Sequence, residues 1–377
     1  MFIAIRDLTY ARGRFLLMGI VVSLVSFLVI MLSGLSAGLV KANISGLMAL
    51  PATHIAFEYT DHPGYRNTMV ERYMWEGWVG QAGVKRVEPM GHTVFNARSA
   101  ADQPLEIALW GLMPDSIIEP MVTRGEQLGE LENGVIISGG LADEGIEVGD
   151  MITLDRVLTE LVVVGIMEEV RTIGHVPIIY APLRKWQEAT YGPPGGPPPG
   201  ESLPDIVFDF VSVIMLQLEE GTAIEALDDQ NETLTLDRLK FYSASTGYDA
   251  EVQSVQLIQW LLFVISAVVI GAFFSIWTIQ RTNEIGLVKA LGASNGYLVR
   301  DSLSQAFFLV GAGTLVGMGL AIWLGIAAEG SEMPFMLETS TLITAMAALM
   351  VAGMIGAGMS VNRITSIDPI IALGRVQ

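Results

Sequence analysis

Four long stretches of apolar residues without a charged side chain divide this chain. They cover residues 15–40, 257–279, 302–328 and 339–362. Even the shortest of them would span about 35 Å as a helix, and the hydrocarbon core of a bilayer is about 30 Å thick. With flanking helical turns included, the pattern predicts four transmembrane helices at residues 15–40, 252–280, 301–328 and 339–362.

Residues 41–251, between the first two spans, have a different pattern. Short apolar or alternating runs bounded by turn residues predict strands at 134–138, 151–154, 161–166, 176–180 and 208–218. Helical segments are predicted at 141–146, 182–190 and 223–229, and the proline-rich run 192–204 predicts an irregular surface loop. The predicted fold class is therefore an α-helical membrane protein with four transmembrane helices and one α+β domain inserted between helices 1 and 2.

Basic residues orient the spans, because Lys and Arg near span ends favour the cytoplasmic side. They gather before the first span, between the second and third, and after the fourth: Arg6, Arg12, Arg14, Arg281, Lys289, Arg300, Arg363 and Arg375. The loop at 329–338 has none. We therefore expect a cytoplasmic amphipathic segment at 1–14, a cytoplasmic segment at 281–300, a short outer loop at 329–338 and a cytoplasmic tail at 363–377. The domain at 41–251 is then extracytoplasmic.

The formal charge of −19 is concentrated in that outer domain. It holds 33 Asp and Glu against 13 Lys and Arg, which leaves 7 against 8 for the rest of the chain. So acidic a surface keeps a domain soluble and argues against nucleic-acid binding. The chain also has no cysteine, which excludes disulfides and thiolate metal sites.

Motifs for catalysis are missing from the sequence. There is no Gly-Lys dipeptide, so the chain has no P-loop, and there is no HExxH zinc motif. The four histidines, at positions 54, 62, 92 and 175, lack metal-ligand spacing. The spans carry no charge, which disfavours an ion-coupled transporter. We expect no intrinsic enzyme activity and no intrinsic cofactor.

The segment 281–293, RTNEIGLVKALGA, lies between two spans and predicts a short cytoplasmic helix. Thr282 or Asn283 could cap it, Glu284 suits its first turn, and Gly292 could end it. Its apolar residues Ile285, Val288 and Leu291 offer anchors for a partner protein, and Gly286 allows another backbone to approach closely. Within the spans, the glycines at 313, 317, 353, 356 and 358 predict close helix packing.

Glu284-Ile285-Gly286 followed by Lys289-Ala290-Leu291-Gly292-Ala293 resembles the cytoplasmic signature of MacB/FtsX-type permeases of ABC transporters. The tail at 363–373 also resembles their C-terminal pattern. Further stretches at 6–15, 32–35 and 174–177, together with Trp186, are similar to the haem-exporting permeases of that family.

The resemblance implies a subunit of the bacterial cell (inner) membrane that pairs with a separate ABC ATPase, which binds ATP and Mg. It implies a permease homodimer in contact with membrane lipid, and mechanotransmission through the cytoplasmic segment. The residues implied in coupling to the ATPase are Arg281, Glu284, Ile285, Gly286, Lys289 and Gly292.

Haem is the substrate that the closer resemblance implies. Its iron takes Met, His or Tyr ligands, and residues of these types near the outer ends of spans one and two are Met31, Met48, His54 and Tyr248. Two alternatives stay open: an FtsX-like regulator of a cell-wall protein partner, and an exporter of a lipid, lipoprotein or peptide.

Overall fold

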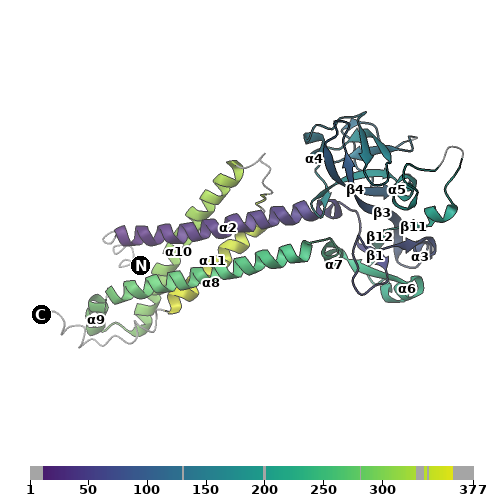
Figure 1. Cartoon of the computed structure of the whole chain (residues 1–377). Coiled ribbons are helices and arrows are strands. Elements are labelled where there is room, and N and C mark those ends of the chain that lie inside the picture. The colour runs from purple at the N-terminus through teal and green to yellow at the C-terminus, as the bar shows by residue number, and fades with distance from the viewer. Residues whose placement is uncertain are drawn as a thin grey trace. The chain divides into compact units, whose positions relative to one another are not determined.

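The computed structural model describes residues 12–129, 131–197, 201–280, 282–327, 335–337 and 339–359 (Figure 1). Contacts divide the chain into two units. The membrane unit comprises Met1–Leu39 and Glu251–Gln377, and the outer domain comprises Val40–Ala250. The predicted fold class, four spans with one α+β domain inserted after the first, is confirmed.

Within the described residues, four helices are long and apolar enough to cross a membrane. They are α2 (Arg12–Met48), α8 (Tyr248–Gln280), α10 (Asn295–Ala327) and α11 (Thr339–Met359). Helix α2 continues eight residues past the predicted end at 40, and α10 begins six residues before the predicted start at 301. Polar residues such as Lys41 and Asn43 end the apolar run without ending the helix, so hydropathy misplaced both boundaries. The segments 1–11 and 363–377, and residues 329–334 and 338 of the outer loop, lie outside the described residues.

Glycines allow the helices of the membrane unit to pack closely. A Cβ on Gly356 of α11 would collide with the carbonyl oxygen of Ala267 in α8, and one on Gly317 of α10 would collide with that of Ser23 in α2. Such close approach is a main source of packing energy where no water drives helices together. Gly358 meets nothing within 4 Å. The predicted packing role therefore holds for Gly317 and Gly356 and is wrong for Gly358 within the described residues.

The outer domain is built on a mixed sheet in the order β13-β1-β12-β3-β4-β10-β6-β8-β5, with β7 and β9 at its sides. The strands β10 and β4, and also β6 and β8, pair in parallel, and the other pairs are antiparallel. The strands are β1 (His54–Glu58), β2 (Val70–Glu71), β3 (Val84–Arg98), β4 (Pro104–Leu112), β5 (Arg124–Gly125), β6 (Gly134–Ile137), β7 (Met151–Leu154), β8 (Glu160–Ile166), β9 (Thr172–Ile173), β10 (Val176–Pro182), β11 (Phe210–Val211), β12 (Val213–Leu218) and β13 (Thr233–Asp237).

The 15-residue strand β3 joins the two halves of the sheet. Its first part pairs with β12 and its second part with β4. The covering helices are α3 (Arg72–Trp78), α4 (Gly139–Asp143), α5 (Leu183–Tyr191), α6 (Ile224–Asn231), α7 (Arg238–Ser243) and the 3-10 helix η1 (Asp205–Asp209).

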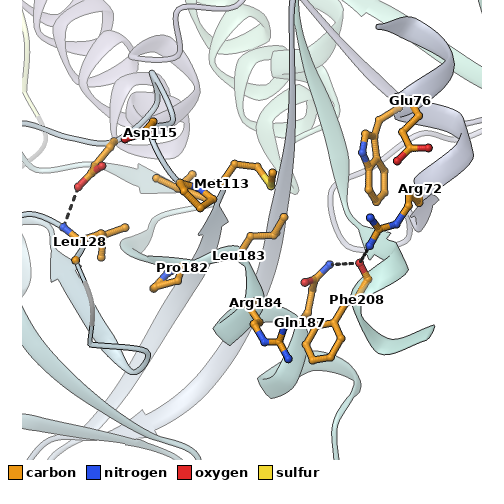
Figure 2. Close-up of a pocket in the computed structure, with 15 residues that line it drawn as sticks. Arg72, Glu76, Met113, Asp115, Leu128, Pro182, Leu183, Arg184, Gln187 and Phe208 are labelled. Atoms are coloured by element: carbon orange, nitrogen blue, oxygen red, sulfur yellow. Dashed lines mark hydrogen bonds between the residues drawn. The ribbon is translucent and has the colours of Figure 1, made fainter. Parts of the chain in front are cut away.

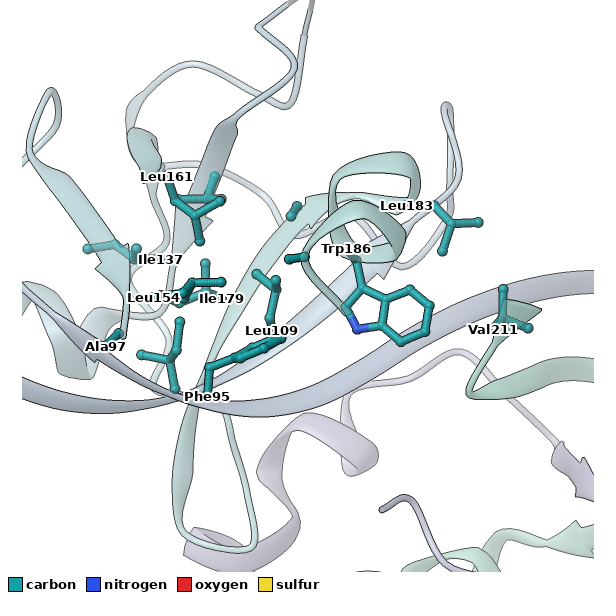
Figure 3. Packing of buried hydrophobic residues seen from close by; sticks show 14 of the residues in the cluster. Phe95, Ala97, Leu109, Ile137, Leu154, Leu161, Ile179, Leu183, Trp186 and Val211 are labelled. Atoms are coloured by element: carbon teal, nitrogen blue, oxygen red, sulfur yellow. The ribbon is translucent and has the colours of Figure 1, made fainter. Parts of the chain in front are cut away.

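Two hydrophobic cores lie in the outer domain. The first includes Phe95, Leu109, Ile179 and Trp186, the last of which is a fully buried residue of α5 (Figure 3). The second contains the end of α2, because Ile44 and Leu47 are buried in it with Trp110 and Tyr180. The last turns of the first long helix are therefore part of the outer domain's core.

Most of the predicted elements of the outer domain are present. The predicted strands 134–138, 151–154, 161–166 and 176–180 are β6, β7, β8 and β10, and the predicted helices 182–190 and 223–229 are α5 and α6. The helix expected at 141–146 is α4, which begins two residues earlier. The proline-rich segment has no helix or strand among its described residues.

The single strand predicted at 208–218 is wrong. It is split among η1, β11 and β12, because β11 pairs with β2 and β12 pairs with β3. Between them, the Ser212 hydroxyl accepts a hydrogen bond from the His92 amide at 2.9 Å and donates to the His92 carbonyl at 3.0 Å. The segment changes partner strands at Ser212, and no local pattern indicates that.

Candidate functional site

The segment between the second and third spans forms helix α9 (Thr282–Ala290). Gly292 ends it with φ +96°, and the amide of Ala293 donates to the carbonyl of Val288 at 3.1 Å. This is the bond pattern of a left-handed glycine C-cap, so the predicted end at Gly292 is confirmed. The cap predicted for Thr282 is wrong, because its hydroxyl donates to the carbonyl of Ile279 at 2.7 Å in the preceding helix.

Two leucines form the exposed apolar surface of this segment. Leu287 is 50% exposed and Leu291 is 80% exposed. Four residues apart on a helical turn, they lie next to each other on one face. Ile285 and Val288, which the sequence suggested as anchors, are half-buried instead. Leu287 was missed as an apolar anchor, although its i, i+4 spacing from the predicted anchor Leu291 could have identified it.

The other predicted coupling residues have different environments. Gly286 is buried and Lys289 is half-buried in the last turn of α9. Arg281 and the side chain of Glu284 lie outside the described residues. The structure therefore places Ile285, Gly286, Lys289 and Gly292 on one short helix and its cap.

In the outer domain, a buried amide near the end of α2 connects three segments. The side chain of Asn43 accepts from the Ser245 hydroxyl at 2.9 Å and donates to the Thr246 carbonyl at 3.4 Å. The carbonyl of Asn43 accepts from the amide of Gly174 at 2.8 Å. We call Asn43, Gly174, Ser245 and Thr246 the Asn43 clasp. Sequence reasoning did not find it, because its partners are up to 203 residues apart.

A second connection lies two residues further along α2, at Ser45. The Ser45 hydroxyl is 2.8 Å from the Thr172 hydroxyl and accepts from the Thr172 amide at 2.8 Å. The Thr172 hydroxyl also hydrogen-bonds to the carbonyl of Ala42. At Ile44, between these contacts, the backbone leaves helical geometry with φ −123° and ψ 18°. Strand β9 therefore holds the end of α2 on both sides of a kink.

The four candidate haem ligands are divided between the two units. Met31 belongs to the membrane unit, where it packs against a core with Val29 and Ile30. Met48 is the last residue of α2 and is 47% exposed. His54 begins β1, where its Nδ1 lies 3.0 Å from the Thr53 hydroxyl.

Tyr248 begins α8 and packs against the second core of the outer domain. Burial lowers the pKa of His54, so its imidazole is neutral near pH 7, the form that binds a metal. No group of three or more His, Asp or Glu residues that could hold a metal ion occurs in the described part of the chain. Haem iron needs at most two protein side chains as axial ligands, so haem binding does not require a cluster of three such residues.

A cleft of about 600 Å³ opens in the outer domain between α3, α5, η1 and the loop after β4 (Figure 2). The Arg184 guanidinium lies 4.1 Å from the centre of the Phe208 ring, and Arg72 pairs with Asp209 at 2.7 Å. Buried Gln187 donates to the carbonyls of Phe208 and Phe210 at 3.0 and 2.9 Å. The remaining lining is apolar or acidic: Trp75, Glu76, Leu112, Met113, Pro114, Asp115, Glu119, Leu128, Gly129, Pro182 and Leu183.

These features define a multi-span membrane protein with one large α+β domain inserted after its first span. Residues 15–234 match the MacB-like periplasmic core domain, and residues 257–369 match the FtsX-like permease C-terminal domain. The chain belongs to the MacB/FtsX family of ABC-type permeases, as its cytoplasmic signature predicted. The inserted domain is accordingly extracytoplasmic.

Relatives with assigned names include full-length matches. The chain is 25% identical over 383 residues to a protein of Staphylococcus haemolyticus that carries the name of a hemin transport system permease, HrtB, covering 100% of this chain and 99% of that protein. A pyoverdine export ATP-binding/permease protein, PvdT, of Pseudomonas syringae is 34% identical over 94 residues, which are 25% of this chain and 14% of that one.

Among solved structures, the periplasmic region of MacB from Actinobacillus actinomycetemcomitans is similar with a TM-score of 0.35 and 10% identity. That similarity covers 52% of this chain and 94% of the other. The family assignment rests on the two matched domains.

Proposed function

We propose that this chain is the permease subunit of an ATP-driven exporter that works by mechanotransmission and expels haem from the membrane. The observation that supports this most is the burial of the end of α2 in the core of the outer domain. A helix that belongs to both units passes a movement of the membrane unit directly to the outer domain.

The energy comes from a separate ABC ATPase that binds ATP and Mg and docks on α9. Leu287 and Leu291 supply the apolar contact, in keeping with the way buried apolar anchors dominate protein interfaces. Both termini lie in the cytoplasm, and two copies of the chain pair within the bacterial cell membrane, among its lipids, with two ATPases.

The cargo is haem, because the full-length relative above is named for hemin transport. Met48 has an exposed thioether at the outer end of α2, and His54 offers a neutral imidazole. Met31 and Tyr248 complete the candidate set. Haem would be held by such side chains and by apolar surface without a pre-formed cluster.

Haem titration tests the cargo. Purified full-length protein in detergent is titrated with haem while its absorbance is recorded, and the measurement is repeated with Met31→Ala, Met48→Ala, His54→Ala and Tyr248→Phe combined. We expect weaker binding and a shifted absorbance band in the combined variant. If the combined variant has the same spectrum and affinity as wild type, these four residues are not the haem ligands. If haem does not stimulate the ATPase activity of the complex, haem is not the cargo.

A second function, regulation of an extracytoplasmic protein partner, is favoured by the outer-domain cleft. Its lining combines Arg, Trp, Phe and Met, the residue types enriched at protein interfaces. Under this hypothesis Arg184→Ala and Phe208→Ala abolish capture of the partner and alter cell shape or division, while haem tolerance is unchanged. If instead haem tolerance falls while cell shape and division are unchanged, the result supports export.

A further inference from the structure

We propose that Asn43 is the positioning residue through which the two membrane helices that flank the outer domain move it as one body. This inference rests on the transmission mechanism proposed above. It concerns the Asn43 clasp, where one buried side chain contacts both ends of the domain: α2, on which it lies, and the turn of Ser245 and Thr246 that leads into α8.

Asn43 is 1% exposed, so its side-chain amide is buried within the outer domain. A buried amide costs free energy unless its donor and its acceptor are both satisfied. Here Oδ1 accepts from the Ser245 hydroxyl and Nδ2 donates to the Thr246 carbonyl. Ser245 is itself buried. A pair of directed bonds of this kind sets both the distance and the rotation between two segments, which apolar packing does not.

The backbone around Asn43 is arranged for the same purpose. Its carbonyl accepts from Gly174, and the preceding carbonyl of Ala42 accepts from Thr172, so both oxygens are engaged outside the helix. The non-helical Ile44 follows directly. Two consecutive carbonyls directly before the kink are therefore bonded to β9 and to the glycine that follows it.

The consequence is mechanical. Helix α2 enters the domain at Val40, three residues before Asn43, and α8 begins at Tyr248, three residues after Ser245. If the membrane unit shifts one helix relative to the other, the clasp either breaks or carries the outer domain with it. We infer that it stays closed and carries the domain through the cycle.

A double variant separates coupling from stability. Asn43→Leu keeps the branched shape of the side chain and strands the Ser245 hydroxyl. Ser245→Ala strands Oδ1 of Asn43. In the combined Asn43→Leu/Ser245→Ala variant neither the Ser245 hydroxyl nor Oδ1 of Asn43 is stranded, and the carbonyl that loses a donor belongs to exposed Thr246. Thermal stability should therefore return toward wild type. The matched control is Ser243→Ala, because Ser243 is an exposed residue at the end of α7, two positions before Ser245, and its hydroxyl donates to the local carbonyl of Leu239.

The full-length chain with its ATPase is reconstituted in proteoliposomes, and haem exported per ATP hydrolysed is measured. In the double variant we expect this ratio to fall at least about fivefold, the lower end of typical coupling effects, while ATP hydrolysis and melting temperature stay near wild type. If stability and the ratio are both restored, the clasp is only structural and the proposal is overturned.

A readout that needs no cargo distinguishes failure of the clasp from failure of the proposed function. The chain has no cysteine, so spin labels can be placed on cysteines that replace Leu239 in the outer domain and Trp323 in α10, which are both exposed. The distance between labels is compared with and without ATP and vanadate. A change in the wild-type background that disappears in the double variant supports the clasp. A change that persists overturns it, and no change in the wild-type background overturns mechanotransmission itself.

Discussion

The indole Nε1 of Trp110 donates a hydrogen bond to Nδ1 of His92 at 3.0 Å, inside the outer domain. Both residues are buried, on the paired strands β4 and β3. Because Trp can only donate, His92 must accept at Nδ1 and carry its proton on Nε2. A protonated imidazole would direct an N–H at the indole N–H, so this contact requires the neutral ring.

The His92 contact predicts acid sensitivity. Burial, with a smaller effect from Arg66, lowers the pKa of His92 from 6.5 to about 4. Between pH 6.5 and 4 the unfolded chain takes up a proton at His92 that the folded chain does not. The contribution of neutral His92 to the free energy of unfolding is therefore fully present above pH 6.5 and is lost as the pH falls to 4. This loss is on the order of 3 kcal/mol. Thermal unfolding of His92→Gln at several pH values should show a smaller loss across this window than wild type, and the exposed His62→Gln should behave as wild type.

Glycine substitutions test the packing of the membrane unit. Gly356→Ala places a methyl group against the Ala267 carbonyl, whereas Gly358→Ala on the same helix meets nothing within 4 Å. We expect the first to destabilise the protein by about 1–3 kcal/mol, as overpacking does, and the second to be near neutral. Melting temperatures in detergent measure both. Equal shifts in the two variants would contradict the helix contact described here.

The surface of α9 predicts where the ATPase binds. Removing Leu287 and Leu291 together should weaken binding of the ATPase at least about tenfold, because truncating an apolar hot spot costs more than about 1 kcal/mol. Co-purification and ATPase activity of the complex measure the effect. Leu239→Ala, at an exposed leucine of the outer domain, is the control. Unchanged affinity of the Leu287→Ala/Leu291→Ala variant would direct docking to another surface.

The hydroxyl of Thr172 predicts a contribution to stability at the end of α2. Thr172→Val keeps the side chain's shape and removes the bond to the carbonyl of Ala42 and the contact with the Ser45 hydroxyl. The expected cost is about 1–3 kcal/mol, because the half-buried carbonyl of Ala42 loses its donor and the Ser45 hydroxyl loses a contact. Thermal unfolding measures it against Ser243→Ala, at an exposed residue at the end of α7. A Thr172 variant as stable as wild type would show that apolar packing alone holds the helix end.

Patterns within contiguous stretches of sequence predicted the spans, the end of α9 and several strands. Charge-free runs identify spans because a bilayer demands about 20 apolar residues in succession. Gly292 ends α9 as predicted, because only glycine adopts its positive φ without strain. The strands at 134–137 and 176–182 were visible because apolar residues follow one another between turn residues.

Other features could not be predicted, because they depend on residues far apart in the chain. The segment 208–218 changes partner strands at Ser212, which only its pairing with β2 and β3 determines. Gly356 and Gly358 are equivalent in sequence, and only the position of Ala267 separates them. The candidate haem ligands were chosen by residue type and by their position near the outer ends of spans one and two, and the structure divides them between two units.

By itself, the sequence determined the number of spans, the inserted domain and the family, because hydrophobicity, charge and a short signature are properties of contiguous residues. The tertiary structure alone decided that α2 continues into the outer domain and that Asn43 meets Ser245 across 202 positions. The physical reason is that the hydrogen-bond partners of a buried amide are neighbours in space and not in sequence, so only the folded chain places Ser245 and Thr246 beside Asn43.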